Sequence, residues 1–244
     1  MKIKIVNPNT TWGMTRDIEA AGKRYAWSGT EVYAVSPSTG PESIESQYDE
    51  YLAVPGLLSE ILKGDREEGA DAFIIACFGE PGLMAAREVT DKPVVGIAQA
   101  AFITAKMIAP SFSILYVLPR AEPLVRNALA LHKDEPFCRS CRSTGLGVLD
   151  FHRDPEAGLK ALEEQGRRCI DEDGAESIVL GCAGFAAFMD QLEERLGVPV
   201  IDGAGPAVKL CEMLVGIGRK TVKTGFWAPP EPKQIFGLDD IRKY

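Results

Sequence analysis

The second half of the chain repeats the first at a nearly constant offset. Residues 71–79 run from an acidic residue through an apolar stretch to Cys77 and a glycine, and residues 176–184 repeat this order around Cys182. Further on, residues 92–101 resemble residues 198–207. One matching segment can arise by chance, but a strand, a cysteine and a next strand that recur in order indicate an internal duplication.

Each half alternates short β-rich runs with segments of helical periodicity, and both halves contain strands that are apolar on both faces. This alternation predicts βαβ units and mostly parallel sheets. We therefore expect an α/β protein of two similar Rossmann- or flavodoxin-like, three-layer α/β/α domains with parallel sheets, related by a pseudo-two-fold axis. The expected strands are residues 2–6, 31–35, 72–76, 94–97, 112–117 and 176–180, and the expected helices include 12–26, 50–64 and 83–89.

No linker rich in proline, glycine or serine divides the chain, so the two domains must share crossing segments. We expect residues 1–98 together with 206–227 to form the first domain and residues 99–205 to form the second. Residues 228–244, which contain three prolines, are expected to run along the surface as a tail.

The net charge of −8 argues against binding to nucleic acid or to an anionic membrane surface, since both need clustered cations. The chain has no apolar stretch of about 18 residues to span a bilayer, and its first residues lack the pattern of a signal peptide. We expect a cytoplasmic homo-oligomer with a small-molecule substrate. Only two histidines occur, which argues against a histidine-rich metal site, and we expect no metal.

Cys77 and Cys182 close equivalent strands of the two halves, and ligands of parallel sheets bind beyond such strand ends. If the halves face each other, the two thiols approach one ligand from opposite sides. One thiolate can then remove a proton from a carbon atom while the opposite thiol returns one to the other face, which inverts the stereocentre without a cofactor. The helix that is expected after each cysteine should lower the thiol pKa. A cysteine after a buried strand can also be a small core residue, but the duplicated position favours catalysis.

Several motifs accompany these cysteines, and through them the chain resembles the Asp/Glu/hydantoin racemase superfamily, in particular its hydantoin and allantoin racemase branch. The resemblance implies two α/β domains with the active site in the cleft between them, and cofactor-independent racemisation with Cys77 and Cys182 as the catalytic residues. It places substrate-contacting residues at Asn9, Ser43, Phe78, Gly79, Ala183 and Gly184, with Tyr116 beside them; Asn9 can equally be a turn or cap residue. The motifs are residues 6–10, 42–46, 48–50, 76–82, 96–98, 144–145, 148–150 and 180–184.

Four positions depart from the pattern of hydantoin racemases. Tyr116 and Val117 stand where two threonines are usual, Gln99 where glutamate is usual, and Phe185 where methionine is usual. These departures leave the substrate open between a 5-substituted hydantoin and allantoin. The alternatives are a racemase of the aspartate and glutamate type, a relative of arylmalonate decarboxylase or maleate isomerase, and a degenerate small-molecule binding protein. Which cysteine acts on which enantiomer also stays open.

Four further cysteines lie outside the repeated motif. Cys138 and Cys141 form a C-x-x-C pair that could be redox-active or half of a zinc site, but no second pair exists. We expect this pair to lie in a loop as incidental thiols. Cys169 and Cys211 fall in helical patterns and are expected in the core.

Overall fold

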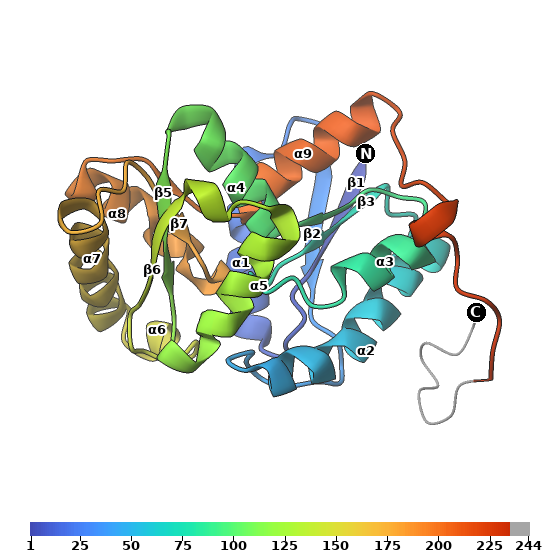
Figure 1. Ribbon diagram of the computed structural model, residues 1–244. Helices are drawn as coiled ribbons and strands as arrows, with labels where there is room; N and C mark the ends of the chain where they lie inside the picture. Colours follow the sequence, from blue (N-terminus) through green and yellow to red (C-terminus); the bar gives the residue numbers. More distant parts are fainter. Residues whose placement is uncertain (235–244) are drawn as a thin grey trace.

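The computed structural model describes residues 1–234 of the chain. Within this range, two four-stranded parallel sheets lie in separate halves of the molecule (Figure 1), with strand orders β2-β1-β3-β4 and β6-β5-β7-β8. The two orders match strand for strand, which confirms the duplicated α/β architecture. The strands are β1 (Lys2–Val6), β2 (Glu31–Val35), β3 (Ala72–Ile75), β4 (Val94–Gly96), β5 (Phe112–Tyr116), β6 (Cys138–Ser143), β7 (Ile178–Leu180) and β8 (Val200–Ile201).

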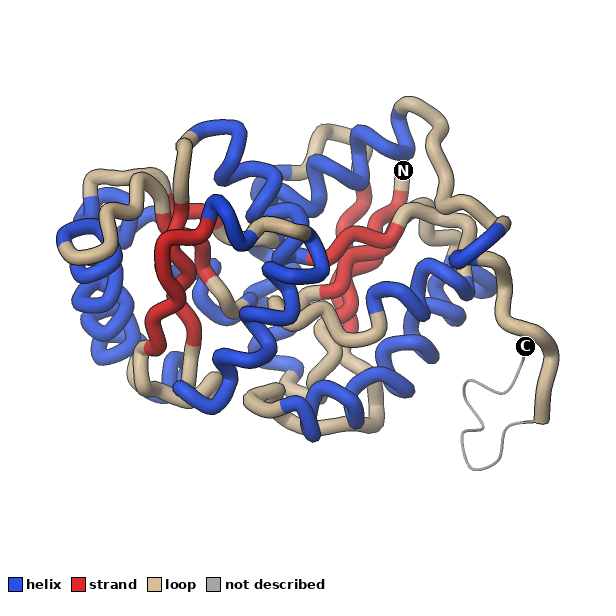
Figure 2. Tube along the Cα trace, in the orientation of Figure 1, coloured by secondary structure: helices blue, strands red, loops and turns tan. Residues whose placement is uncertain are grey.

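Helices surround both groups of strands (Figure 2). In chain order, α1, α2, α3 and α4 of the first half correspond to α5, α7, α8 and α9 of the second, and α4 and α9 pack on each other. Within residues 1–234, none of the helices combines the length and apolar character that crossing a membrane requires. The helices are α1 (Trp12–Tyr25), α2 (Gln47–Lys63), α3 (Leu83–Val89), α4 (Ile97–Ile108), α5 (Glu122–His132), α6 (Asp150–Arg153), α7 (Pro155–Asp171), α8 (Met189–Leu196) and α9 (Ala204–Gly216).

The central strands are fully buried because helices cover both faces of each sheet. Every residue of β3, β5 and β7 is buried, and one continuous core cluster contains residues from both halves. The helix α9 packs on β3 and β4 of the first sheet. The proposed domain boundaries stay a prediction, and residues 235–244 of the expected tail lie outside the described residues.

The segment with the C-x-x-C pair is a strand, so the predicted loop is wrong. β6 forms the edge of the second sheet and pairs in parallel with β5, with a bulge that aligns Phe112 with Cys138 and Ile114 with Cys141. The two Sγ atoms lie 3.8 Å apart as free thiols. Edge strands carry polar residues because one side faces solvent, which is why this polar segment lacked the apolar pattern of a strand.

The helices α2 and α7 begin with equivalent caps. The Ser46 side chain accepts the N–H of Asp49 at 3.3 Å, and the Asp154 side chain accepts the N–H of Ala157 at 3.0 Å. Because each cap satisfies a helix N–H group that otherwise lacks a partner, we expect Ser46→Ala and Asp154→Ala each to lower the free energy of unfolding by about 1 kcal/mol. Urea denaturation measures the change.

A serine in the middle of α2 provides the control for the caps. Ser59 lies in the helix interior, where alanine is the better helix former, so Ser59→Ala should not destabilise the protein. Equal unfolding midpoints for Ser46→Ala and Ser59→Ala would contradict the capping role.

Candidate active site

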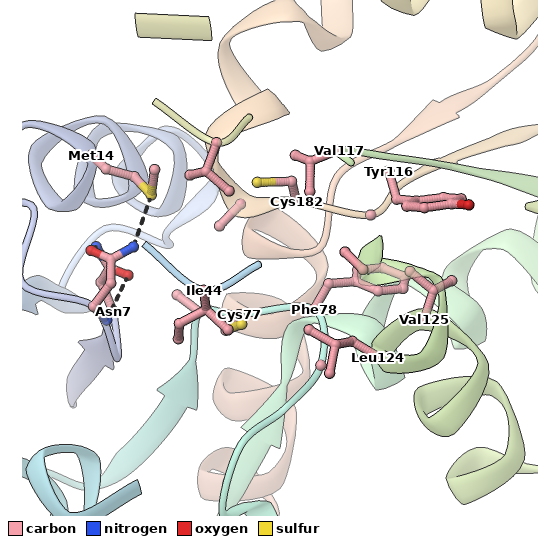
Figure 3. Close-up of a pocket in the computed structure, with 17 residues that line it drawn as sticks. Asn7, Met14, Ile44, Cys77, Phe78, Tyr116, Val117, Leu124, Val125 and Cys182 are labelled. Atoms are coloured by element: carbon pink, nitrogen blue, oxygen red, sulfur yellow. Dashed lines mark hydrogen bonds between the residues drawn. The ribbon is translucent and has the colours of Figure 1, made fainter. Parts of the chain in front are cut away.

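Cys77 and Cys182 lie on opposite sides of one cleft between the two halves (Figure 3). Ala76 separates Cys77 from the end of β3, and Gly181 separates Cys182 from the end of β7. The cleft contains about 530 Å³ of empty space, including its part that opens to solvent, and both cysteine residues are partly exposed. The structure therefore brings the two predicted thiols to one site.

The backbone repeats the same contact at each cysteine. The N–H of Gly79 bonds to the sulfur of Cys77, and the N–H of Gly184 bonds to the sulfur of Cys182. A backbone N–H favours the thiolate without adding a charged side chain to the cleft. The duplication has thus preserved one donor for each sulfur, two residues after the cysteine.

The predicted lowering of the thiol pKa values is wrong. Burial raises the pKa of Cys182 to about 11 and that of Cys77 well above its usual range, despite the N–H donors. Regular helix does not follow Cys77 directly, because residues 78–82 form turns and α3 begins at Leu83, as predicted. The apolar surroundings of the thiols therefore outweigh the dipoles that follow them.

The lining of the cleft is mostly apolar. Asn7 and Asn9 are buried polar exceptions, and the Nδ2 of Asn7 donates to the Oδ1 of Asn9 at 2.9 Å. The same Oδ1 accepts the N–H of Thr11 at 2.9 Å, so Asn9 is a turn residue that also lines the cleft. The apolar lining residues are Met14, Ile44, Ala76, Phe78, Val117, Ala121, Leu124, Val125, Val148 and Ala183.

Most of the residues that the resemblance assigns to the site lie at the cleft, and two do not line it. Ser43 is absent from the lining, where its neighbour Ile44 takes the place. Gly184 is also absent from the lining, and a Cβ on it would lie 3.5 Å from Cε of Met14 and 3.7 Å from the sulfur of Cys182. The predicted residues that do line the cleft are Asn9, Cys77, Phe78, Gly79, Tyr116, Cys182 and Ala183.

Of the four positions that depart from the hydantoin racemase pattern, two line the cleft and two do not. Tyr116 and Val117 line the cleft, and the Tyr116 hydroxyl donates to the Glu122 carboxylate at 3.4 Å. Burial and Glu122 raise the pKa of Tyr116 to about 12, so it stays a neutral phenol. By contrast, Gln99 accepts from Arg87, and Phe185 is fully buried with its ring centroid 4.4 Å from that of Phe151.

Two carboxylates beside the Cys77 turn were not predicted. Glu80 is buried, has a left-handed φ of 54°, and accepts the N–H of Gln99 at 2.8 Å while its other oxygen contacts the His132 ring. Glu50 lies in the first turn of α2 and points at Gly79. In the sequence, Glu50 is an ordinary acidic residue of a first helical turn, and nothing around Glu80 indicates that its side chain is buried, so only the packing reveals these two positions.

Comparisons with known proteins agree with this geometry. The family model described as Asp/Glu/hydantoin racemase matches residues 3–211. The chain is 53% identical to a hydantoin racemase of Pseudomonas sp. (strain NS671), over 97% of this chain and 95% of that protein. It also resembles the structure of an allantoin racemase from Klebsiella pneumoniae, with 41% identity, a TM-score of 0.96 and 100% of each chain covered.

A more distant structure shares only the fold. The glutamate racemase from Francisella tularensis is 14% identical, with a TM-score of 0.65 over 93% of this chain and 85% of that chain. The family match and the high identity to curated relatives both span nearly the whole chain. The chain therefore belongs to the Asp/Glu/hydantoin racemase family of isomerases.

Proposed function

We propose that the protein racemises a 5-substituted hydantoin or allantoin by proton transfer between Cys77 and Cys182. The observation that carries the proposal is the pair of thiols on opposite walls of one cleft, each with a backbone N–H on its sulfur. The names of the relatives, hydantoin racemase and allantoin racemase, support the class of substrate.

In the proposed reaction, one thiolate takes the proton from the ring carbon that carries the substituent. The electron pair left on that carbon delocalises into the adjacent ring carbonyl as an enolate. The opposite thiol then donates its proton to the other face of the carbon and becomes the thiolate. Asn9 can orient the ring, because its Nδ2 lies 3.4 Å from the sulfur of Met14, a weak acceptor that leaves this donor available to a carbonyl.

The chemistry of the lining favours an uncharged ring over a free amino acid. Among the described residues, those that line the cleft include no lysine, arginine, aspartate or glutamate. The ammonium and carboxylate groups of an amino acid would lose water there without gaining a partner of opposite charge, which is costly. A hydantoin presents only amide-type donors and acceptors, which the two asparagines and the backbone can satisfy.

The test is a substrate panel in D₂O. Each enantiomer of several 5-substituted hydantoins, allantoin, aspartate and glutamate is incubated with the protein, and NMR follows the carbon-bound proton while circular dichroism follows the optical activity. We expect both signals to decay with at least one hydantoin or with allantoin, and to persist with the amino acids. A panel without any exchange would falsify the racemase and leave a binding protein.

The rate is expected to increase with pH. Burial raises the pKa of Cys182 to about 11 and that of Cys77 further, so only a small fraction of either thiol is ionised near neutrality. Below a thiol pKa the thiolate fraction grows about tenfold per pH unit, and kcat/KM reports the ionisation of the free enzyme. We therefore expect kcat/KM to rise steeply between about pH 6 and pH 8. A profile that is flat over this range contradicts a thiolate base with a raised pKa.

A further inference from the structure

The duplicated site is not symmetric, because the two halves differ where a long helix approaches each cysteine turn. The helices α2 and α7 both have 17 residues and equivalent N-caps. The fourth residue of α2 is Glu50, and the fourth residue of α7 is Gly158. The fourth position of the helix therefore carries a carboxylate in the first half and no side chain in the second.

The Glu50 carboxylate is packed into the Cys77 turn. A Cβ on Gly79 would collide with Oε1 of Glu50, so the carboxylate reaches this place only because residue 79 is a glycine. This oxygen is buried and has no hydrogen-bond partner among the described residues. Ala53, one turn along α2 from Glu50, packs in the small apolar cluster that Cys77 contacts. An unpaired carboxylate oxygen thus lies beside the turn that holds the thiol.

In the second half, an aromatic ring packs against the equivalent position of α7. A Cβ on Gly158 would lie 2.6 Å from a ring carbon of Phe151. The carboxylate that acts on Cys182 is Glu45, and its Oε1 already accepts the N–H of Val148 at 2.8 Å. Within residues 1–234, the unpaired carboxylate therefore belongs to the Cys77 side alone.

The charge of Glu50 opposes a second negative charge on Cys77. The titratable groups that act on Cys77 are Glu50 from α2, Glu80 from its own turn and Cys182 across the cleft, with Glu50 the strongest of the three. Glu80 is engaged by His132 and the N–H of Gln99. Burial raises the pKa of Glu50 to about 7, so its carboxylate is mostly ionised at pH 8 and above.

We propose that Glu50 is a positioning residue that fixes the starting roles of the pair: it holds Cys77 as the thiol, so that the resting enzyme presents Cys182 as the base. The inference rests on the proposed function for its catalytic meaning. The enantiomer whose proton faces Cys182 enters turnover directly. For the opposite enantiomer, the proton must first move from Cys77 to Cys182.

The effect of the Glu50 charge on Cys77 is tested by measuring how fast each cysteine is alkylated. Iodoacetamide reacts with the thiolate, and peptide mass spectrometry gives separate rates for Cys77 and Cys182 at several pH values up to about 9.5. In the wild-type protein we expect Cys182 to react faster. Glu50→Gln should raise the rate at Cys77 about three- to thirtyfold, since a neighbouring charge shifts a thiol pKa by about 1–3 units and the lower basicity of the thiolate cancels about half of the gain on a logarithmic scale. The rate at Cys182 should change less than about twofold, because Glu50 is not among the groups that act on it.

Two further variants make the result specific. Glu50→Asp keeps the charge but withdraws it by one methylene, so the alkylation rate of Cys77 should lie between those of wild type and Glu50→Gln. If the glutamine variant does not fold, the aspartate variant tests the inference by itself. Glu42→Gln removes the same charge from an exposed position and should leave both rates unchanged. An unchanged Cys77 rate, or equal changes at both cysteines, overturns the inference. Alkylation needs no turnover, so failure of the substrate panel and failure of this experiment are separate results.

Discussion

Serine in place of Cys77 or Cys182 is expected to reduce racemisation by about 10²–10⁴-fold, the usual contribution of a general acid or base. A serine hydroxyl ionises far less readily than a thiol, so one face of the substrate carbon loses its proton carrier. The remaining thiolate can still remove the proton that faces it and return a deuteron from solvent to the same face. Each variant should therefore exchange the proton of one enantiomer without inverting it, and the two variants should act on opposite enantiomers.

The measurement combines NMR in D₂O with circular dichroism, applied to each pure enantiomer of the best substrate of the panel. Cys141→Ser provides the control, because Cys141 is a partly exposed thiol on β6 that does not line the cleft. This variant should keep wild-type racemisation. The two-base mechanism is wrong if either cleft variant racemises at the wild-type rate, or if both variants exchange the same enantiomer.

The position of the two thiols could be predicted because it depends on local and repeated features. A buried apolar strand that ends at a cysteine fixes where the side chain lies relative to its own sheet. The duplication then predicts a second cysteine in the second sheet. Because both sheets are parallel, each cysteine lies at the carboxyl edge of its own sheet. Asn9, which follows β1, and Tyr116, which ends β5, were assigned through the resemblance to the family, and both line the cleft.

The residues that were missed lie where no periodic pattern decides the direction of a side chain. Ser43 and Ile44 belong to an irregular segment before α2, and there the apolar residue, not the polar one, lines the cleft. Glu50 has an ordinary place in a first helical turn, and its burial depends on Gly79, which lies in another segment of the chain. Such contacts exist only in three dimensions.

The direction of the thiol pKa shifts also could not be predicted from the sequence. In the structure, each cysteine is followed two residues later by a glycine whose N–H bonds to the sulfur, Gly79 for Cys77 and Gly184 for Cys182. The sequence could not weigh those donors against the burial of the thiols, because burial is set by side chains from both halves. Desolvation is the larger effect at both thiols, so their pKa values rise.

The buried Glu80 carboxylate is expected to support the Cys77 turn, and Glu80→Ala should lower the free energy of unfolding by about 3 kcal/mol. In the wild-type protein the carboxylate accepts the Gln99 N–H at 2.8 Å and contacts the His132 ring, so it ties the turn to the start of α4 and the end of α5. Alanine leaves both of these groups without an acceptor, at a cost of about 1–3 kcal/mol each. Racemisation should also fall at least about tenfold, since a small displacement of a catalytic group is enough to cost that much.

Urea denaturation and the racemisation assay measure the two effects of Glu80→Ala, and two variants separate their cause. Glu80→Gln keeps an acceptor for Gln99 and a polar contact with His132, so it should lose only about 1 kcal/mol. Glu135→Gln removes an exposed carboxylate just beyond α5 and should stay within about 0.5 kcal/mol of wild type. If Glu80→Ala were as stable and as active as Glu135→Gln, the Cys77 turn would be held by its own backbone contacts, such as the Glu80 N–H to the Cys77 carbonyl at 3.0 Å. A loss of activity without a loss of stability would instead show that Glu80 acts on the position of Cys77 more than on the fold.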